Sequence, residues 1–99
     1  MNESREHILR ILEENRDHIR GFGVRRLGLF GSGARGEAKT HSDLDFIVEF
    51  QTKSFDAYMD LKFFLEDVFQ RKVDLVLADG IKARLRSPIL GETVYVQGL

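Results

Sequence analysis

The apolar residues of this chain fall into stretches with two different spacings. Over residues 3–20 they recur every three or four positions, as in an amphipathic helix, whereas residues 44–50 are almost continuously apolar, as in a strand buried on both faces. Read in this way, the pattern predicts helices over residues 3–20, 32–36, 55–69 and 81–86, and strands over residues 24–30, 44–50, 72–77 and 93–96. Gly21 and Gly23 are expected to end the first helix, and Pro88 the last.

The order of these elements predicts an α/β fold. Helices and strands alternate along the 99 residues, which is typical of a small mixed β-sheet flanked by helices and of a single domain, residues 1–99. The pattern leaves the order of the strands in the sheet open. Because so short a chain buries a limited core, a homo- or hetero-oligomer could add stability.

Composition narrows the class of protein. Hydrophobic residues make up 42% and charged residues 31%, which is typical of a globular protein and too apolar for disorder. A formal charge of -1 argues against a strongly basic nucleic-acid surface, although it does not exclude a nucleotide. The absence of cysteine excludes disulfides, thiolate zinc sites and cysteine nucleophiles. No apolar run is long enough for a membrane span and no secretory signal is visible, so we expect a cytoplasmic protein.

Small residues follow the strand expected over residues 24–30. Gly31, Ser32 and Gly33 stand where the strand gives way to a short helix, so free backbone N–H groups would point at whatever binds there. Glycine lets a phosphate oxygen approach the backbone closely, and Ser32 adds a hydroxyl donor. The turn therefore predicts a phosphate site. The alternative is a structural turn in which Ser32 only caps the helix.

Two acidic residues flank the start of the next strand. Asp43 and Asp45 are two positions apart, so in a strand their side chains share one face. Carboxylates held together repel one another unless a cation offsets them, and such hard oxygen ligands suit Mg²⁺ or Mn²⁺. Asp45 also interrupts an apolar run, where an unpaired charge is costly. The alternative is that Asp43 caps a turn and Asp45 is solvated.

A third acid interrupts the apolar strand over residues 72–77. If that strand lies beside the one over residues 44–50, Asp74 stands near Asp43 and Asp45. Three carboxylates could then bind two metal ions, one activating a nucleophile and the other holding a triphosphate. The alternative is that Asp74 pairs with an arginine at the edge of the sheet.

These motifs together resemble a known superfamily. Gly31-Ser32, ten intervening residues, Asp43-Leu44-Asp45 and a later Asp74 are similar to the DNA polymerase β type of nucleotidyltransferase. The whole run from Gly31 to Val48 resembles more closely the minimal nucleotidyltransferases (MNT), which are often the antitoxins paired with HEPN toxins in bacteria and archaea. The resemblance covers nearly the whole chain and is specific as a set of motifs.

The resemblance implies a polymerase β-like core and a metal-dependent transfer of a nucleoside monophosphate. In this family pattern Gly31 and Ser32 would hold the triphosphate, and Asp43, Asp45 and Asp74 would bind two Mg²⁺ ions, with Mn²⁺ as a substitute. The implied reaction moves AMP from ATP to a tyrosine of a partner HEPN toxin. The other interpretations are a nucleotidyltransferase for a small molecule and an antitoxin that neutralises its toxin by binding alone.

Several further residues have open roles. Arg35 could contact a phosphate or pair with Asp43 or Asp45. His41 and Glu37 fit a solvated loop better than a substrate contact, and the basic residues Lys82, Arg84 and Arg86 fit a solvated face. The helix over residues 55–69 is too aromatic for one inward face, since its adjacent residues Phe63 and Phe64 cannot both point into the core. This surplus favours a surface for a partner protein.

Overall fold

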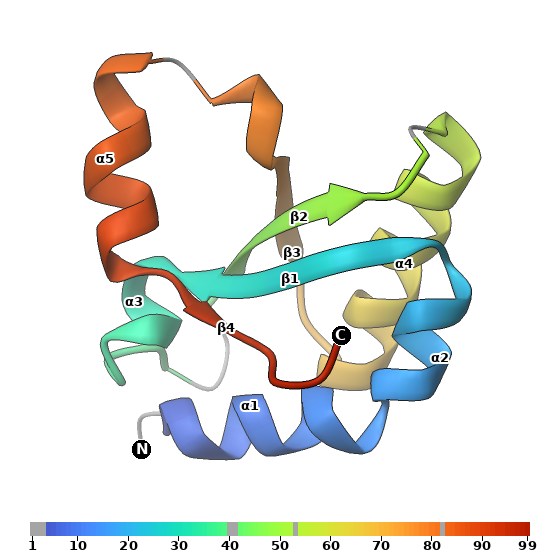
Figure 1. The fold of residues 1–99 in the computed structure, drawn as a ribbon. Coiled ribbons are helices and arrows are strands. Elements are labelled where there is room, and N and C mark those ends of the chain that lie inside the picture. Colours follow the sequence, from blue (N-terminus) through green and yellow to red (C-terminus); the bar gives the residue numbers. More distant parts are fainter. Residues whose placement is uncertain (1–3, 40–41, 53, 82) are drawn as a thin grey trace.

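The computed structural model describes residues 4–39, 42–52, 54–81 and 83–99. Figure 1 shows its elements, which are α1 (Arg5–Glu14), α2 (Arg16–Gly21), β1 (Val24–Phe30), α3 (Gly31–Ala34), β2 (Leu44–Phe50), α4 (Phe55–Phe69), β3 (Val73–Leu77), the 3₁₀ turn η1 (Ala78–Gly80), α5 (Ala83–Glu92) and β4 (Val94–Tyr95). His41 and Lys82, to which the sequence gave possible roles, lie outside the described residues, as does the side chain of Arg86. None of the described helices combines the length and apolar character needed to cross a membrane.

The described strands form one mixed sheet in the order β3-β2-β1-β4. β1 pairs antiparallel with both β2 and β4, whereas β2 and β3 run parallel. The parallel pair requires a crossover connection, which α4 provides. A mixed sheet flanked by helices confirms the expected fold class, and the strand order supplies what the apolar pattern left open.

The main core lies between one face of the sheet and the helices α1, α2 and α4, which Figure 1 shows packed along that side. Alternate residues of each strand contribute to this core face, because side chains along a strand point to opposite sides. The buried cluster includes Ile8, Leu12, Ile19, Leu27, Leu29, Leu44, Phe46, Val48, Leu61, Leu65 and Leu75.

The other side of the sheet, which we call the site face, carries Asp45, Ile47 and Glu49 of β2 and Asp74 of β3. Ile47 is as deeply buried as the core residues but does not belong to the main cluster. Charged residues therefore sit on a sheet whose opposite face is fully packed.

The structure divides the first expected helix in two. Asn15 leaves the helical conformation, with φ −104° and ψ 14°, and its side-chain amide donates to the carbonyl oxygen of Ile11 at 2.8 Å. Such local bonding by asparagine competes with the helical backbone. The apolar stripe continues across the break, since Leu12 and Ile19 are both buried. The prediction of one helix over residues 3–20 is therefore wrong.

Pro88 does not end the last helix, as the sequence pattern suggested. α5 extends to Glu92 with Pro88 inside it. Proline removes a single backbone donor and holds φ in the helical range, so contacts beyond it can sustain the helix. Glu92 provides such a contact, because its carboxylate accepts a hydrogen bond from the backbone of Gly31.

The remaining elements match the expected boundaries closely. β1, β2 and α4 have the predicted bounds, and α3, β3 and β4 differ by one or two residues at their ends. Residues 78–80, between the third strand and the last helix, form the 3₁₀ turn η1. These small differences are within the ordinary scatter of element boundaries.

Candidate active site

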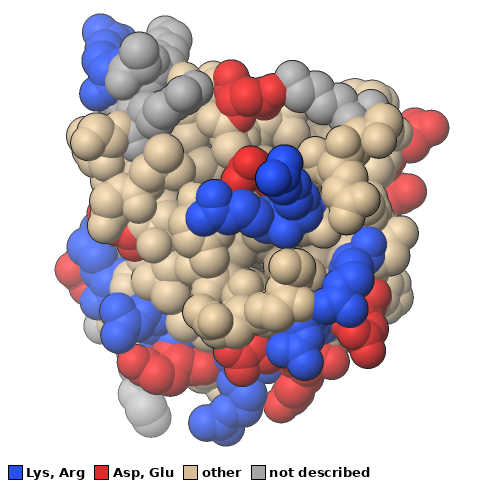
Figure 2. All heavy atoms as spheres, viewed as in Figure 1, with Lys and Arg blue, Asp and Glu red and all other residues tan. Residues whose placement is uncertain are grey.

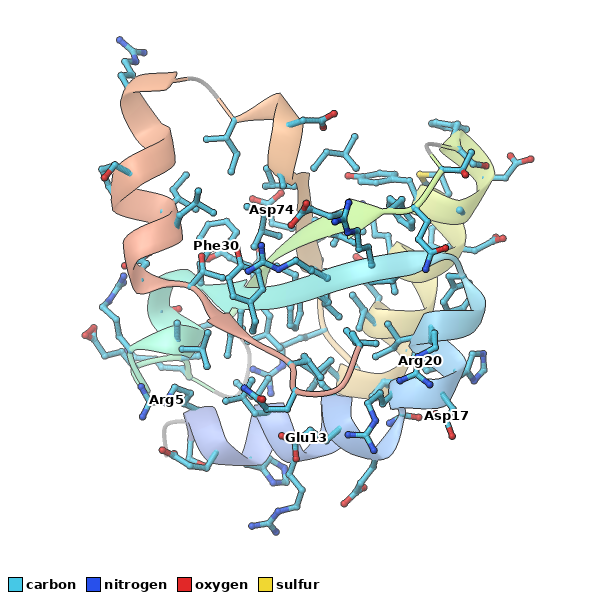
Figure 3. All side chains as sticks on the ribbon, viewed as in Figure 1. Arg5, Glu13, Asp17, Arg20, Phe30 and Asp74 are labelled. Atoms are coloured by element: carbon cyan, nitrogen blue, oxygen red, sulfur yellow. The ribbon has the colours of Figure 1, made fainter. Side chains whose placement is uncertain are left out.

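The two acids that interrupt neighbouring apolar strands lie side by side. Asp45 of β2 is the register partner of Asp74 of β3, and neighbouring strands lie about 4.8 Å apart. Figure 3 labels Asp74 on this side of the sheet, together with Phe30, which pairs with Asp45 from β1. Asp74 is exposed and, within the described part of the chain, has no ion-pair partner. The alternative in which Asp74 pairs with an arginine is therefore not supported.

Asp43 stands at the entrance to β2. It is exposed, directly precedes the strand, and lies two positions before Asp45. Ser42 shapes the turn before it, because its hydroxyl accepts a hydrogen bond from the backbone N–H of Lys39 at 3.1 Å, while the N–H of Ser42 donates to the carbonyl of Lys39 at 3.0 Å.

Three nearby carboxylates act on the half-buried carboxyl group of Asp45. Burial raises the pKa of Asp45 above its ordinary value, and the nearby charges of Asp74, Asp43 and Glu92, in that order, raise it further. Arg35 acts in the opposite direction, but it does not outweigh the acids. The site therefore carries an excess of negative charge around a half-buried carboxylate.

This donor set suits a hard divalent cation, since carboxylate oxygens are the ligands that Mg²⁺ and Mn²⁺ prefer. A cation would also relieve the repulsion that raises the pKa of Asp45. In this conformation, however, no three acidic or histidine side chains among the described residues converge closely enough to hold one ion. Asp45 and Asp74 form the adjacent pair. The charges of Asp43 and Glu92 are close enough to raise the pKa of Asp45.

Gly31 begins α3 directly beside this pair. Its φ of +70° is in the left-handed region that favours glycine. A Cβ at this position would overlap Oδ2 of Asp45, so the turn and the acid fit together only because the side chain is absent. Gly33 has a different explanation, because it is buried and a Cβ there would press on the side chain of Leu29 at 3.0 Å.

Ser32 lies inside α3 and does not cap it. Phe30 occupies the N-cap position, and no side chain caps this helix. The Ser32 hydroxyl makes no hydrogen bond to any residue that the structure describes, and the side chain is half-buried beside Gly31. The capping alternative is therefore wrong, and the hydroxyl is available to a ligand.

Glu92 is a site residue that sequence reasoning missed. Its Oε1 accepts a hydrogen bond from the backbone N–H of Gly31 at 3.0 Å, and its Oε2 accepts one from Nη1 of Arg35 at 3.0 Å. Arg35 also donates to Glu37 at 3.3 Å, and these two hydrogen bonds raise the pKa of the guanidinium. Among the described residues Arg35 therefore forms ion pairs with Glu37 and Glu92, and not with Asp43 or Asp45, which was one of its two open roles. Glu92 is 61 positions from Gly31 and belongs to no local motif, so no sequence signal pointed to it.

The aromatic residues of α4 divide between interior and surface. Phe64 packs against His18 and Phe22, with ring centroids 4.3 and 5.5 Å away. Phe63 and Phe55 are 57% and 77% exposed, respectively. Phe63 and Phe64 therefore do not both face inward, as expected, and the role of the exposed rings in binding a partner stays a prediction.

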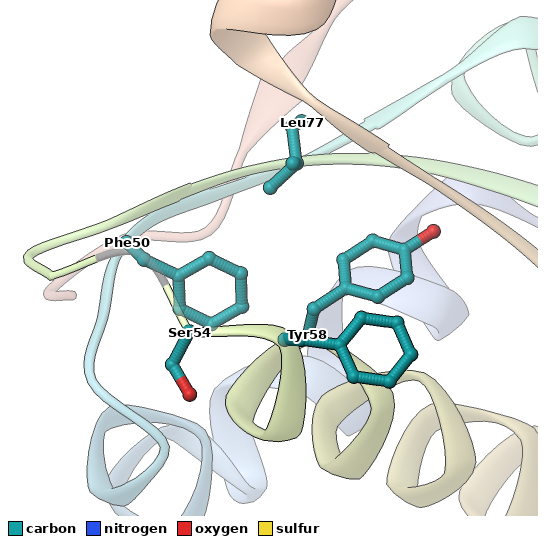
Figure 4. Close-up of a pocket in the computed structure, with 5 residues that line it drawn as sticks. Phe50, Ser54, Tyr58 and Leu77 are labelled. Atoms are coloured by element: carbon teal, nitrogen blue, oxygen red, sulfur yellow. The ribbon is translucent and has the colours of Figure 1, made fainter.

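Hollows among the described residues also lie away from Asp43, Asp45 and Asp74. An apolar pocket of about 380 Å³ opens at the start of α4, as Figure 4 shows, and is lined by Phe50, Ser54, Phe55, Tyr58 and Leu77. A smaller hollow of about 240 Å³ lies on the site face between α5 and the sheet, lined by Arg26, Glu49, Ala78, Asp79, Leu90 and Tyr95. Three of these lining residues contact one another. The guanidinium of Arg26 stacks 4.0 Å from the ring centroid of Tyr95 and forms an ion pair with Glu49 at 3.2 Å.

The surface charges are mixed over the face seen in Figure 2. Basic and acidic side chains alternate along the edge formed by α1 and α2, and tan surface separates them from the basic groups at the centre of the view. An acidic strand pair beside a glycine turn is a donor set whose chemistry suits phosphate and divalent metal together.

A family model for the nucleotidyltransferase domain matches residues 6–96. The chain belongs to the nucleotidyltransferase family. This membership confirms the resemblance drawn from the Gly-Ser turn and the acids, and with it the enzyme class, a nucleotidyltransferase.

Individual relatives place this nucleotidyltransferase more closely. The protein adenylyltransferase MntA of Thermococcus cleftensis is 40% identical over 93 residues, which cover 92% of this chain and 94% of MntA. A solved minimal nucleotidyltransferase is 35% identical with a TM-score of 0.72, covering 87% of this chain and 93% of its own. A chain of a mutant MntA toxin–antitoxin complex is 26% identical with a TM-score of 0.65, covering 98% of this chain and 74% of its own. The fold is thus that of the minimal nucleotidyltransferases.

Proposed function

We propose that this nucleotidyltransferase moves AMP from ATP to a tyrosine of a HEPN toxin and thereby acts as its antitoxin. The observation that carries the proposal is the pairing of Asp45 with Asp74 directly beside Gly31. A phosphate-binding turn and a metal-binding pair must lie together for a triphosphate to be held and cleaved. The similarity to the relative named protein adenylyltransferase MntA, and to a chain of a solved MntA toxin–antitoxin complex, favours a protein acceptor.

In this proposal each residue has a distinct task. Asp45 and Asp74, with Asp43 at the strand entrance, would bind Mg²⁺, which when bound neutralises the triphosphate and activates the acceptor hydroxyl. The backbone N–H of Gly31, the Ser32 hydroxyl and the Arg35 guanidinium would receive the outer phosphates.

The reaction is a substitution at the α-phosphorus of ATP. The tyrosine oxygen forms a bond to that phosphorus, the bond to the bridging oxygen of the β-phosphate breaks, and pyrophosphate leaves. One carboxylate of the acid cluster accepts the phenolic proton. Positioning and charge neutralisation supply most of the rate in such transfers, which explains why the site consists of donors and carboxylates rather than a covalent nucleophile.

Labelling of the toxin tests this function directly. The protein is incubated with ATP labelled at the α-phosphate, Mg²⁺ and a candidate HEPN partner, and label on that partner is measured. The variant Asp45→Asn with Asp74→Asn is expected to lose at least about 10³-fold in rate, because both ligands of the adjacent pair lose their charge. Glu13→Gln, which changes an exposed acid on α1, is the matched control and should label at the normal rate.

The outcomes separate the competing functions. Full labelling by the double variant contradicts the assigned acids. Neutralisation of the toxin by the double variant without labelling favours an antitoxin that acts by binding alone. Mapping the label by mass spectrometry to a residue other than tyrosine contradicts the proposed acceptor.

Removal of divalent metal tests the cofactor independently. We expect labelling to stop in excess EDTA and to return when Mg²⁺ or Mn²⁺ is added, because the carboxylates otherwise repel the triphosphate. Labelling that continues at the same rate in EDTA contradicts a metal-dependent transfer.

A further inference from the structure

One carboxylate satisfies two donors assigned to the triphosphate. Glu92 accepts from the backbone N–H of Gly31 through one oxygen and from Arg35 through the other, both at 3.0 Å. These are charge-assisted bonds, which are roughly twice as strong as neutral ones. The two donors come from the same short segment, whereas Glu92 comes from the end of α5. The carboxylate thus occupies the position in which an anionic ligand would meet both.

A triphosphate and Glu92 cannot both use these donors in the same way. A single backbone N–H makes one strong hydrogen bond, and the Gly31 N–H already donates to Glu92. The acids Asp45, Asp74 and Asp43 lie around the same point, so an additional anion would meet four negative charges if Glu92 stayed in place. The Glu92 carboxylate can leave these donors, because its side chain is 34% exposed and can rotate into solvent without leaving a buried charge.

We propose that Glu92 is a positioning residue that holds the Gly31 N–H and the Arg35 guanidinium in the orientation needed for phosphate, and that a triphosphate must displace it. The inference rests on the proposed function, because it names the competitor at the triphosphate site of the same reaction. Glu92 prevents these donors from being satisfied in some other geometry, and it lowers the apparent affinity for the nucleotide. A binding-competent state that is only partly populated reduces affinity by that fraction.

Triphosphate binding to a Glu92 variant tests this directly. The affinity for ATP with Mg²⁺ is measured by titration calorimetry for the wild type, Glu92→Gln and Glu37→Gln. Glu92→Gln should bind ATP roughly tenfold more tightly, because a neutral amide competes less strongly than a carboxylate for the two donors. Glu37→Gln is the matched control, since it removes an equal charge and a partner of Arg35 but leaves Gly31 untouched. Its affinity should change by less than about twofold, as expected for an exposed pair.

A second measurement follows the backbone N–H of Gly31, the donor for which Glu92 and the triphosphate compete. In ¹⁵N-resolved NMR spectra, the Gly31 amide resonance is expected to shift in Glu92→Gln and to shift again when ATP saturates the wild type. Thermal unfolding of each variant reports whether α5 stays in place. A merely structural role for Glu92 predicts weaker ATP binding together with a lower Tm, which is the opposite of the expected gain in affinity.

The results distinguish failure of this inference from failure of the function. If the wild type binds ATP and Glu92→Gln binds it equally or more weakly, displacement is wrong while the transferase function stands. If ATP leaves the Gly31 resonance unchanged at saturation, the phosphate does not take the place of Glu92. If neither protein binds ATP, the proposed function and the inference both fail.

Discussion

Successive residues of β2 serve two different purposes. Phe46 and Val48 are fully buried in the core face, whereas Asp45 and Glu49 lie on the site face with access to solvent. The same backbone hydrogen bonds fix both sets, so the packed face holds the charged face in position. Residues that stabilise the fold and residues of the candidate site can therefore be neighbours in sequence, because successive side chains of a strand point to opposite faces of the sheet.

Truncation of the core face should have the largest effect. Phe46 is fully buried and its ring lies 5.8 Å from that of Phe69, so Phe46→Ala removes a large packed group and leaves a cavity. We expect a loss of about 3–5 kcal/mol in the free energy of unfolding, measured by chemical denaturation. A loss below about 1 kcal/mol would show that the two faces contribute to stability more equally than the burial indicates.

Gly31→Ala should have the next largest effect, because the backbone of Gly31 packs directly against the Asp45 carboxylate of the site face. The new Cβ would overlap the Asp45 carboxylate and would force a residue with a side chain to keep φ at +70°. We expect a cost on the order of 1–3 kcal/mol in unfolding free energy, together with loss of ATP binding.

Gly36→Ala is the matched control for that change. Gly36 has φ +72°, nearly the same as Gly31, but a Cβ there would meet no atom within 4 Å. It carries the backbone strain without the clash, so the difference between the two variants measures the contact between Gly31 and Asp45. Equal effects on ATP binding would contradict a special role for that contact.

Asp45→Asn should change stability in the opposite direction. Burial and neighbouring acids raise the pKa of Asp45, so the folded state binds its proton more tightly than the unfolded state, and ionisation of Asp45 destabilises the fold. In metal-free protein at neutral pH, we expect Asp45→Asn to raise Tm by about 2–4 °C, or about 0.5 kcal/mol after allowance for solvent screening.

The pH dependence of stability tests the same property of Asp45. Wild-type stability should increase as the pH falls through the raised pKa of Asp45, because the proton is then bound in the folded state. The advantage of Asp45→Asn should therefore shrink on acidification in melting curves recorded with EDTA. If the higher Tm of Asp45→Asn stays constant across the same pH range, ionisation of Asp45 is not what destabilises the wild type.

Glu49→Gln should have the smallest effect. Glu49 pairs with Arg26 at 3.2 Å on the site face, but both side chains are partly exposed, at 34% and 52%. Exposed pairs of this kind contribute about 0–1 kcal/mol, and we expect a change in unfolding free energy near the lower end. A cost comparable to that of Phe46→Ala would remove the contrast between the faces.

Sequence pattern was sufficient where one spacing dominated a whole element. β1, β2 and α4 have the predicted bounds because one kind of spacing, that of a strand or that of a helix, dominates each of them. The break at Asn15 was missed because the apolar stripe passes through it unchanged, and the signal lies in a side-chain bond to Ile11. The continuation of α5 past Pro88 depends on tertiary contacts, which local propensity does not include.

The site shows the same division between local and distant information. Gly31, Ser32, Asp43 and Asp45 lie in one stretch, and Asp74 could be joined to them by assuming that two apolar strands are neighbours, as the register now shows. Their roles in binding metal and phosphate stay predictions. Glu92 could not be predicted in this way, because the sequence around it resembles no site. Only the packing of α5 against α3 brings it to Gly31.

Asp74 has a second consequence that concerns solubility rather than chemistry. Within the described sheet β3 pairs only with β2, and α4 covers part of its other edge, where the Val73 N–H donates to Glu66 and the Leu75 carbonyl accepts from the Tyr58 hydroxyl. Apolar edge strands of this kind recruit further strands from other molecules, and a charge within the strand opposes such pairing. The carboxylate that completes the acid pair therefore also protects the protein from aggregating through its own sheet.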